Sequence, residues 1–324
     1  MRVAITGAGG FLGLSLTRAL LAQGNEVRCL VRRAGQILPG ASGEVEVFLA
    51  DVSDAASLER AFRGVEVVFH LAGVRRAPSR QLFFEVNAEG TRNVCEAMLG
   101  AGAGHLVFCG SLAAAGPSTK ERPRVEEDPP SPQEWYGESK GEGERIALSY
   151  RPRLKVCSAR PCRILGPGDR ENLLFFRLVQ RGIRLSIGGG PRPLSLVDVE
   201  DVANFLILLA QNPRAEGEAF FVAASGTMTL EDIEDRVARA LGVSPRTVSV
   251  PPSALKALAL MADAAAPLLR RPLPLNRKLA RQLLAPAWTC SGAKAERLLG
   301  FRPTISIADS IDRSAAWYQR HGWV

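Results

Sequence analysis

A glycine-rich turn near the beginning of the chain constrains the fold more than any other feature. Thr6-Gly7-Ala8-Gly9-Gly10-Phe11-Leu12-Gly13 follows an apolar run at residues 3–6 and opens a helix predicted over about residues 10–23. Glycines in this pattern allow a tight turn, a close approach of backbone amides to a pyrophosphate, and close packing of helix on strand. Glycine triplets also occur in purely structural turns, but the position between strand and helix predicts dinucleotide binding by Gly7, Gly10, Phe11, Leu12 and Gly13.

Further apolar runs alternate with helical stretches through the first half of the chain. They lie at residues 27–31, 45–50, 65–71, 106–109 and 155–160. Continuous apolar strands separated by helices indicate a parallel sheet covered on both faces. Since the crossovers are right-handed, we predict an α/β fold with a Rossmann doubly wound parallel sheet.

The helix after the run at residues 106–109 has a readable beginning. A loop rich in proline and charge occupies residues 116–131. Ser131 is the predicted N-cap, with Pro132 at the first helical position and Glu134 three residues after the cap.

The regular alternation ends at Gly166-Pro167-Gly168-Asp169. Helical patterns dominate from there, apart from a predicted return to the sheet around residues 202–222. We therefore expect residues 1–165 and 194–225 to form the dinucleotide-binding Rossmann domain. Residues 166–193 and 226–324 should form a smaller, mainly helical C-terminal substrate-binding domain.

Composition excludes several classes of function. The chain has 324 residues, is 46% hydrophobic and carries a formal charge of +8, but its arginines are spread without a basic run. Such a charge fits attraction of an anionic dinucleotide and does not indicate nucleic acid. The six cysteines are scattered and are expected to be reduced core thiols, and the three histidines lack metal-ligand spacing, so no metal site is predicted. No leader or long apolar run is evident, which predicts a cytoplasmic protein.

The end of the second predicted strand bears on the choice of cofactor. Arg32 and Arg33 follow Val31, and no carboxylate is present to bind the ribose hydroxyls. We predict a preference for NADP(H), with both arginines at the 2′-phosphate and NAD(H) as the alternative; a solvated loop is the other interpretation of the pair. Asp51 and Val52 follow the third strand, where they suit either adenine contact or a turn.

Three side chains form a candidate catalytic centre. Tyr136 and Lys140 are four residues apart, hence on one helical face, where a lysine cation lowers the pKa of a phenol and makes it a usable acid/base. The spacing is frequent by chance, and an exposed pair is the alternative. Ser111 follows a buried strand, at the sheet edge where ligands bind in doubly wound folds.

Together these pieces resemble the extended short-chain dehydrogenase/reductase family, also called the NAD-dependent epimerase/dehydratase family. The motifs behind the resemblance are the glycine turn, His70-Leu71-Ala72-Gly73, Val86-Asn87, Ser111, Tyr136-Gly137-Glu138-Ser139-Lys140, Arg160-Pro161, Gly166-Pro167-Gly168-Asp169 and residues 196–203. The resemblance spans nearly the whole chain and implies an NAD(P)-dependent dehydrogenase/reductase.

It also implies roles for individual residues. Tyr136 would be the acid/base, Lys140 would hold the nicotinamide ribose and tune the tyrosine, and Ser111 would position a carbonyl. The cofactor would also contact Leu71, Ala72 and Gly73 after the fourth strand, and Pro161 at the end of the sixth strand. Family members are often dimers, so a homodimer is expected.

Two departures from the family pattern narrow the chemistry. Dehydratases of the family have an acidic pair after the catalytic Ser/Thr, whereas this chain has Leu112 and Ala113. Sugar-nucleotide epimerases usually keep an acidic residue where Arg32 stands. The pattern is closer to dihydroflavonol-reductase-like and 3-beta-hydroxysteroid-dehydrogenase-like ketone reductases. We expect reduction of a ketone on a mostly apolar small molecule, or oxidation of the alcohol.

Alternatives remain open at this point. One is a sugar-nucleotide epimerase with tightly bound NAD, and another is a non-catalytic dinucleotide-binding sensor. The Ala/Leu/Met-rich residues 253–284, with Arg270, Arg271, Arg277, Lys278 and Arg281, suit a lid, an interfacial helix on anionic lipid, or plain packing. Arg75, Arg76 and Arg163 suit either an anionic substrate group or the surface.

Overall fold

A seven-stranded parallel sheet forms the centre of the molecule. The computed structural model describes residues 1–33, 45–188, 190–268 and 275–324. The strands are β1 (Arg2–Thr6), β2 (Glu26–Val31), β3 (Val45–Leu49), β4 (Val67–His70), β5 (His105–Cys109), β6 (Lys155–Pro161) and β10 (Ala219–Val222). Their order, β10-β6-β5-β4-β1-β2-β3, reverses direction between β1 and β4. This is the predicted doubly wound Rossmann sheet, and its ligand-binding crevice is expected at that reversal.

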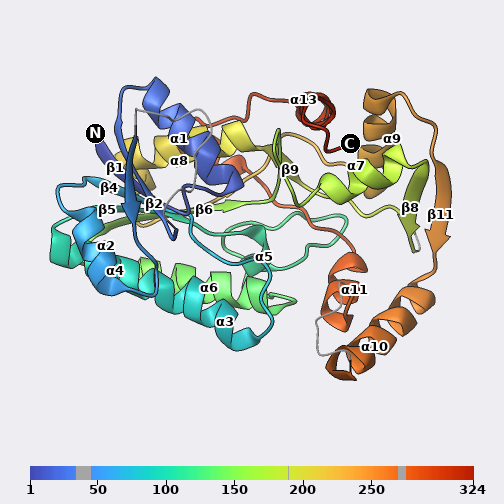
Figure 1. Ribbon diagram of the computed structural model, residues 1–324, viewed down its shortest axis with the longest axis horizontal. Helices are drawn as coiled ribbons and strands as arrows, with labels where there is room; N and C mark the ends of the chain where they lie inside the picture. Colours follow the sequence, from blue (N-terminus) through green and yellow to red (C-terminus); the bar gives the residue numbers. More distant parts are fainter. Residues whose placement is uncertain (34–44, 189, 269–274) are drawn as a thin grey trace.

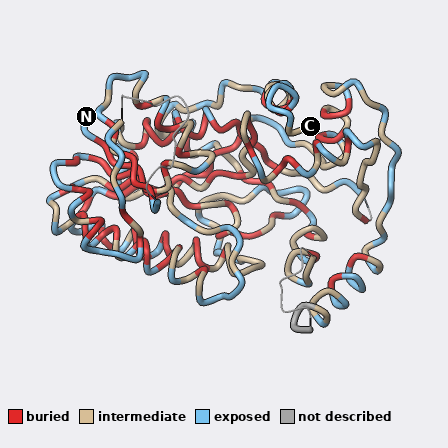
Figure 2. The backbone as a smooth tube through the Cα atoms, in the orientation of Figure 1, coloured by how far each residue is buried: buried red, intermediate tan, exposed pale blue. Residues whose placement is uncertain are grey.

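Helices cover both faces of the sheet because each presents an apolar side to it (Figure 1). On one face, α1 (Phe11–Ala22) and α8 (Val199–Gln211) pack against each other, with α1 on β1 and β2 and α8 on β5 and β6. On the other face lie α2 (Ala55–Phe62), α4 (Gly90–Ala101) and α6 (Trp135–Ser149). The buried residues concentrate in the strands and on the helix sides that meet them (Figure 2).

Short helical elements connect the longer ones. They are α3 (Arg80–Phe84), the π-helix η1 (Glu85–Glu89), α5 (Leu112–Ala115), the 3-10 helix η2 (Pro213–Ala215) and α12 (Ala293–Leu299). The predicted beginning of α6 is wrong, because the helix begins at Trp135 with Glu134 as N-cap. The Ser131 amide instead donates to the Ala115 carbonyl at 2.9 Å, which keeps Ser131 in a loop against the end of α5.

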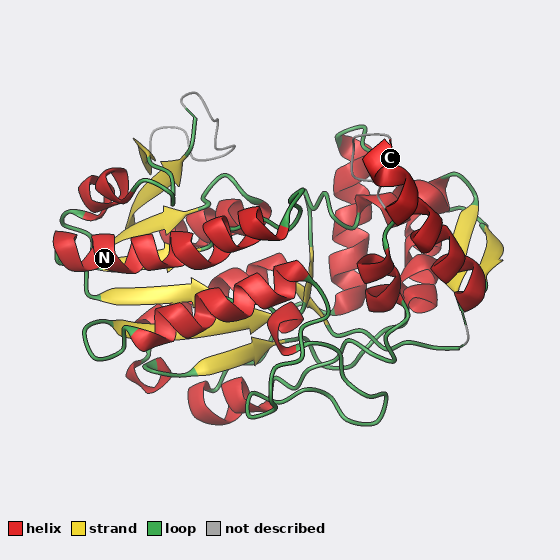
Figure 3. Ribbon diagram, turned by 90° about the horizontal axis from the view of Figure 1, so that it is seen from below, coloured by secondary structure: helices red, strands yellow, loops and turns green. Residues whose placement is uncertain are grey.

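The C-terminal elements form a second apolar core beside the sheet (Figure 3). Helices α7 (Leu173–Gln180), α9 (Leu230–Leu241) and α13 (Ile307–Arg320) pack around side chains that include Phe176, Val237 and Tyr318. Two small parallel sheets of two strands each were not predicted, because their strands are only three to five residues long. In one, β7 (Arg163–Leu165) pairs with β9 (Leu196–Asp198), and in the other, β8 (Ile183–Ile187) pairs with β11 (Arg246–Val250). The predicted return to the sheet is β10, while α8 occupies most of the preceding span.

A helical hairpin projects at the end of the molecule away from β3 (Figure 1). It consists of α10 (Pro252–Leu268) and α11 (Arg277–Leu283), which contact each other around Ala259 and Ala280. Arg270 and Arg271 lie outside the described residues. No helix within the described ranges is both long enough and apolar enough to cross a membrane.

The six cysteines are free and buried, as expected for reduced core thiols. Among the described residues, no three His, Cys, Asp or Glu side chains are grouped so that they can hold a metal ion.

Candidate active site

The glycine turn packs directly against the end of β4. Gly7 has φ +75°, and a Cβ there would lie 2.8 Å from the Ala72 amide nitrogen. A Cβ at Gly13 would collide with the Gly7 carbonyl. Any side chain at these two positions would therefore separate α1 from β1 and β4. The turn brings the predicted segment Leu71, Ala72 and Gly73 next to the N-terminus of α1.

The N-terminus of α1 has the donors that a pyrophosphate requires. Gly10 is the N-cap and supplies no side-chain cap. Among the described residues, no acceptor lies within hydrogen-bonding distance of the Phe11, Leu12 and Gly13 amides. Three unsatisfied N–H groups at the positive end of a helix dipole form an anion site, so the turn fits a dinucleotide phosphate.

The expected adenosine end of the crevice contains Arg32 and Asp51. Arg32 and Arg33 are both exposed at the end of β2. Burial raises the pKa of Asp51, but hydrogen bonds from the Ser53 amide (2.9 Å) and hydroxyl (2.7 Å) and the charge of Arg32 leave it below its ordinary value. Arg32 is therefore close enough to Asp51 for the two charges to interact. Val52 is buried against Gly90, where its role as a cofactor contact stays a prediction.

His70 connects the glycine turn to α4 through directed hydrogen bonds. Thr91 Oγ1 donates its only proton to the Asn87 carbonyl (2.8 Å), so it must accept from His70 Nε2 at 3.0 Å. His70 Nδ1 then accepts from Thr6 Oγ1 at 2.7 Å, and Thr6 Oγ1 accepts from the Ala72 amide at 3.2 Å. Burial, together with the Lys140 charge, lowers the pKa of His70 to about 3. The imidazole is thus neutral, with its proton on Nε2.

Asn87 extends this network to the catalytic helix. Its Oδ1 accepts from the Val74 amide at 2.8 Å, and its Nδ2 donates to the Val74 carbonyl (3.0 Å) and to Ser139 Oγ (2.9 Å). Ser139 Oγ donates to the Tyr136 carbonyl at 2.9 Å. Asn87 lies in the π-helix η1, whose wider turn aims its side chain at these partners. The loop after β4 and the first turn of α6 are therefore held together.

The three predicted catalytic side chains meet at the carboxyl edge of the sheet. Ser111 follows β5 and caps α5, with its Oγ accepting from the Ala113 amide at 3.1 Å. Tyr136 is half-buried in the first turn of α6, and its phenol is close enough to Ser111 for that hydroxyl to affect its pKa. Lys140 is buried, with its ammonium 4.5 Å from the centre of the Phe108 ring. A Cβ at Gly73 would lie 3.9 Å from that ammonium, which places the lysine beside the predicted cofactor segment.

The electrostatics of the tyrosine differ from the expectation. Burial raises the pKa of Tyr136, whereas the charge of Arg75 and then the Ser111 hydroxyl lower it, and the net pKa is above its ordinary value. Burial likewise lowers the pKa of Lys140. Burial therefore outweighs the charge of Arg75, and the tuning of the phenol by Lys140 stays a prediction. In this environment the phenol remains protonated.

Arg75 is a further candidate site residue, whose place the sequence left open. Its guanidinium carbon lies 5.8 Å from the centre of the Tyr136 ring. It also acts on the pKa of Glu134 and of Arg163, so it faces the mouth of the site. Arg76, by contrast, forms an exposed ion pair with Glu171 at 2.7 Å. The only sequence signal was the position of Arg75 directly after the segment at residues 70–73.

The far side of the crevice is formed by the end of β6 and the loop after β7. Pro161 is buried at the end of β6. Gly166, with φ +148°, approaches the Phe11 ring so closely that a Cβ would lie 3.4 Å from its Cζ. Arg163 is half-buried, and its Nε donates to Asn172 Oδ1 at 2.5 Å. The structure therefore commits Arg163 to an internal contact.

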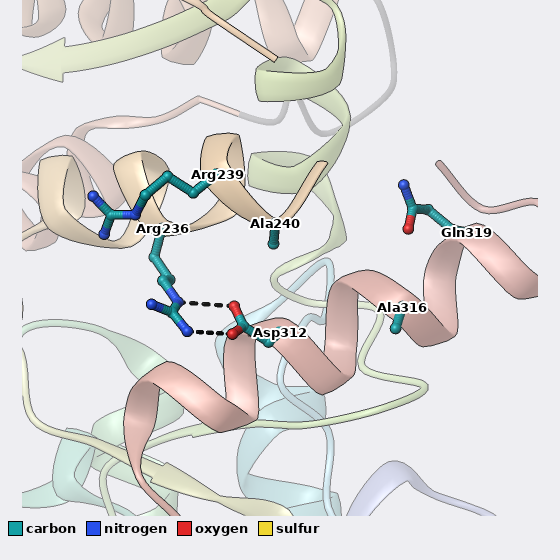
Figure 4. A pocket seen from close by; sticks show the side chains of 6 residues that line it. All are labelled: Arg236, Arg239, Ala240, Asp312, Ala316 and Gln319. Atoms are coloured by element: carbon teal, nitrogen blue, oxygen red, sulfur yellow. Dashed lines mark hydrogen bonds and ion pairs between the residues drawn. The ribbon is translucent and has the colours of Figure 1, made fainter. Parts of the chain in front are cut away.

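A hollow of about 370 Å³ lies apart from these residues, between α9 and α13 (Figure 4). Arg236 Nε donates to Asp312 Oδ1 at 2.8 Å across it, and Arg239 and Gln319 lie at its rim. Because Arg236 and Asp312 pair with each other and hold the two helices together, we interpret the hollow as structural.

Fold and site together define an enzyme class, the extended short-chain dehydrogenases/reductases. A family model described as the NAD dependent epimerase/dehydratase family matches residues 3–223, and the chain belongs to this family. The coarse activity that follows is NAD(P)-dependent oxidoreduction.

Individual proteins agree with this assignment. The chain is similar to ceramide reductase of Caulobacter vibrioides, with 31% identity over 99% of this chain and 96% of that protein. It is 28% identical to 2-alkyl-3-oxoalkanoate reductase of Stenotrophomonas maltophilia, over 98% of this chain and 99% of that one. The UDP-glucose 4-epimerase of Thermus thermophilus, solved with NAD, superposes with a TM-score of 0.80 at 25% identity, over 98% of this chain and 99% of that one.

Proposed function

We propose that the protein is an NADPH-dependent reductase of a ketone on a largely apolar, lipid-like molecule. The observation that carries the proposal is the grouping of Ser111, Tyr136 and Lys140 at the carboxyl edge of the sheet, with the Tyr136 phenol protonated and close to the Ser111 hydroxyl. A phenol that stays protonated at neutral pH is a proton donor, and a proton donor is what reduction of a carbonyl requires. The relatives named as reductases of ceramide and of 2-alkyl-3-oxoalkanoate support an apolar ketone.

In this proposal Ser111, Tyr136 and Lys140 have different roles in catalysis. Ser111 donates a hydrogen bond to the substrate carbonyl and orients it, and Tyr136 delivers a proton from its phenol to the carbonyl oxygen. Lys140 holds the nicotinamide ribose and stabilises the phenolate that remains. The nicotinamide, when bound, supplies the hydride that the carbonyl carbon accepts. Residues 166–193 and 226–324 would form the substrate-binding part.

The preference for NADPH rests on the end of β2. Arg32 and Arg33 are exposed there, and no carboxylate follows the strand in the described residues. Guanidinium groups bind a 2′-phosphate, whereas a carboxylate would bind the ribose hydroxyls of NAD. The two arginines would hold the 2′-phosphate on the adenosine ribose of the dinucleotide whose pyrophosphate the amides at the N-terminus of α1 would bind.

The test measures kcat/KM with both cofactors on a panel of long-chain ketones. Wild-type protein should prefer NADPH, and the double variant R32S/R33S should lose that preference. Tyr136→Phe should lower turnover by roughly 10²- to 10⁴-fold, with NADPH binding within a few-fold of wild type by fluorescence titration. Full turnover by Tyr136→Phe would refute the mechanism. Better use of NADH would refute the cofactor assignment.

The second candidate is a sugar-nucleotide epimerase that retains NAD. The superposition on an NAD-bound epimerase favours it. Native mass spectrometry of the purified protein separates the two, because an epimerase should carry one NAD through purification. Dinucleotide binding without turnover of either substrate class would instead indicate a non-catalytic sensor.

A further inference from the structure

A cavity of about 640 Å³ lies between the α10–α11 hairpin and the loops that flank the catalytic residues. Pockets that bind small molecules have volumes of about 300–1,000 Å³, so this cavity is large enough for one. Its floor comes from the facing sides of the two helices, where Ala259 and Ala280 are almost completely buried. Leu260 and Leu284 continue the apolar lining. No function considered above uses this cavity.

The cavity is next to the catalytic centre along the chain. Pro117, in its wall, directly follows Gly116, which ends the short helix capped by Ser111. Gln133, also in its wall, precedes Tyr136 by three residues. The hairpin is joined to the same region, because the Lys278 ammonium lies 3.0 Å from the centre of the Trp135 ring. A ligand in the cavity would therefore extend towards the first turn of α6.

Among the residues that the structure describes, three cations and no carboxylate line this apolar cavity. Arg277 pairs with Asp263 at 2.8 Å. Lys256 and Arg281 have no ion-pair partner among the described residues. Two uncompensated cations beside an apolar floor attract a molecule that carries both an anionic group and an aliphatic chain.

We propose that this cavity binds a single-chain anionic amphiphile. The chain would lie on Ala259, Ala280 and Leu284, and Lys256 and Arg281 would hold the anionic group. One consequence rests on the proposed function: the substrate would be an acyl-chain ketone that carries a carboxylate or a phosphate. The binding itself does not depend on catalysis.

The first experiment measures binding by isothermal titration calorimetry, with decyl phosphate below its critical micelle concentration as the probe. Wild type and Tyr136→Phe should bind equally. The double variant K256Q/R281Q should lose at least about tenfold in affinity, since each lost charge-assisted contact is worth roughly tenfold. Leu284→Gln should also weaken binding. The matched control Arg239→Gln removes an exposed arginine at the α9–α13 hollow and should change nothing.

Other ligands decide the chemistry of the site. Inorganic phosphate should not compete with decyl phosphate, because it lacks the chain. Equal binding of decyltrimethylammonium, or unchanged affinity in K256Q/R281Q, would overturn the proposal. If the protein sediments with phosphatidylglycerol vesicles but does not bind monomeric decyl phosphate, the proposal is also overturned. The hairpin would then dock on membranes through the exposed Leu258 and Met261.

A turnover experiment separates this inference from the proposed function. The ratio of kcat/KM for 3-oxododecanoate to that for 2-dodecanone should fall at least about fivefold in K256Q/R281Q, since the neutral ketone lacks the anionic group. If neither ketone is reduced but decyl phosphate binding depends on Lys256 and Arg281, the proposed function fails and the site stands. If both ketones are reduced with an unchanged ratio, the site fails and the function stands.

Discussion

The guanidinium of Arg75 lies over the ring of Tyr136, 5.8 Å from its centre, and is the strongest influence that lowers the pKa of this phenol. The arginine follows β4, whereas the tyrosine begins α6, and the Asn87 contacts to Val74 and Ser139 hold these two segments together. Cys109 and Glu134 act in the opposite direction and raise the phenol pKa. The acidity of this phenol thus depends on burial and on a contact between distant parts of the chain.

Replacement of this arginine should change the pH profile of reduction. In Arg75→Gln the phenolate loses a stabilising cation, so the pKa of Tyr136 rises. Reduction needs the phenol, and the alkaline limb of kcat/KM should therefore move up by about 0.5–1 pH unit. Arg76→Gln is the matched control, since Arg76 pairs with Glu171 at the surface. An unshifted limb in Arg75→Gln would show that Arg75 does not tune the tyrosine.

Two glycines of α6 should respond to alanine in opposite ways. A Cβ at Gly143 would collide with the Asn87 carbonyl, so Gly143→Ala should cost about 1–3 kcal/mol of unfolding free energy. At Gly141 the new Cβ would meet the Ala114 Cβ at 3.6 Å, an ordinary contact, and Gly141→Ala should stabilise by about 0.5–1 kcal/mol. Urea denaturation measures both. The same sign for the two variants would contradict the packing of α6 on η1.

His70 should make the fold sensitive to acid. Its pKa of about 3 in the folded protein is below that of an unfolded histidine, about 6.5, so its contribution is present above pH 6.5 and is lost as the pH falls towards 3. Between pH 7.5 and 5.5 the loss is about 1.3 kcal/mol. Chemical denaturation at both pH values measures the unfolding free energy. Its decrease from pH 7.5 to 5.5 should be about 1.3 kcal/mol smaller in His70→Gln than in the wild type. His321→Gln, at an exposed histidine, should behave like wild type.

Glu234 should have the opposite dependence on pH. It is buried, its Oε2 has no hydrogen-bond partner among the described residues, and burial raises its pKa to about 7. The folded state therefore favours the protonated acid, and stability falls as the pH rises from the unfolded pKa of about 4.3 through 7. Glu234→Gln should raise the unfolding free energy at pH 8 by about 1–2 kcal/mol and much less at pH 5.

The control for this substitution is Glu121→Gln, at an exposed glutamate in the loop at residues 116–131, which should give no such pH-dependent gain. Equal effects of Glu234→Gln at pH 5 and pH 8 would show that the buried carboxyl is not protonated in the folded state.

Local patterns were sufficient for the sheet and for the candidate catalytic residues. Apolar runs separated by helical stretches predict parallel strands wherever they occur, because both faces of such a sheet are buried. The spacing of Tyr136 and Lys140 and the strand before Ser111 were likewise visible, since each depends on one helix or one strand end. The beginning of α6 was predicted at the wrong residue, because a local pattern does not contain contacts with distant segments. Ser131 has the chemistry of an N-cap, but its amide is engaged by the distant Ala115 carbonyl.

The sequence by itself determined the Rossmann sheet, the anion site at the N-terminus of α1 and the residue types of the catalytic centre, because these follow from local periodicity and glycine positions. Only the tertiary structure decided that Arg75 faces Tyr136, that His70 is a neutral link between Thr6 and Thr91, and that the α10–α11 hairpin encloses a basic, apolar cavity. The physical reason is burial. The pKa values and charge balance of these groups depend on which distant segments exclude water around them, and residue spacing does not contain that information.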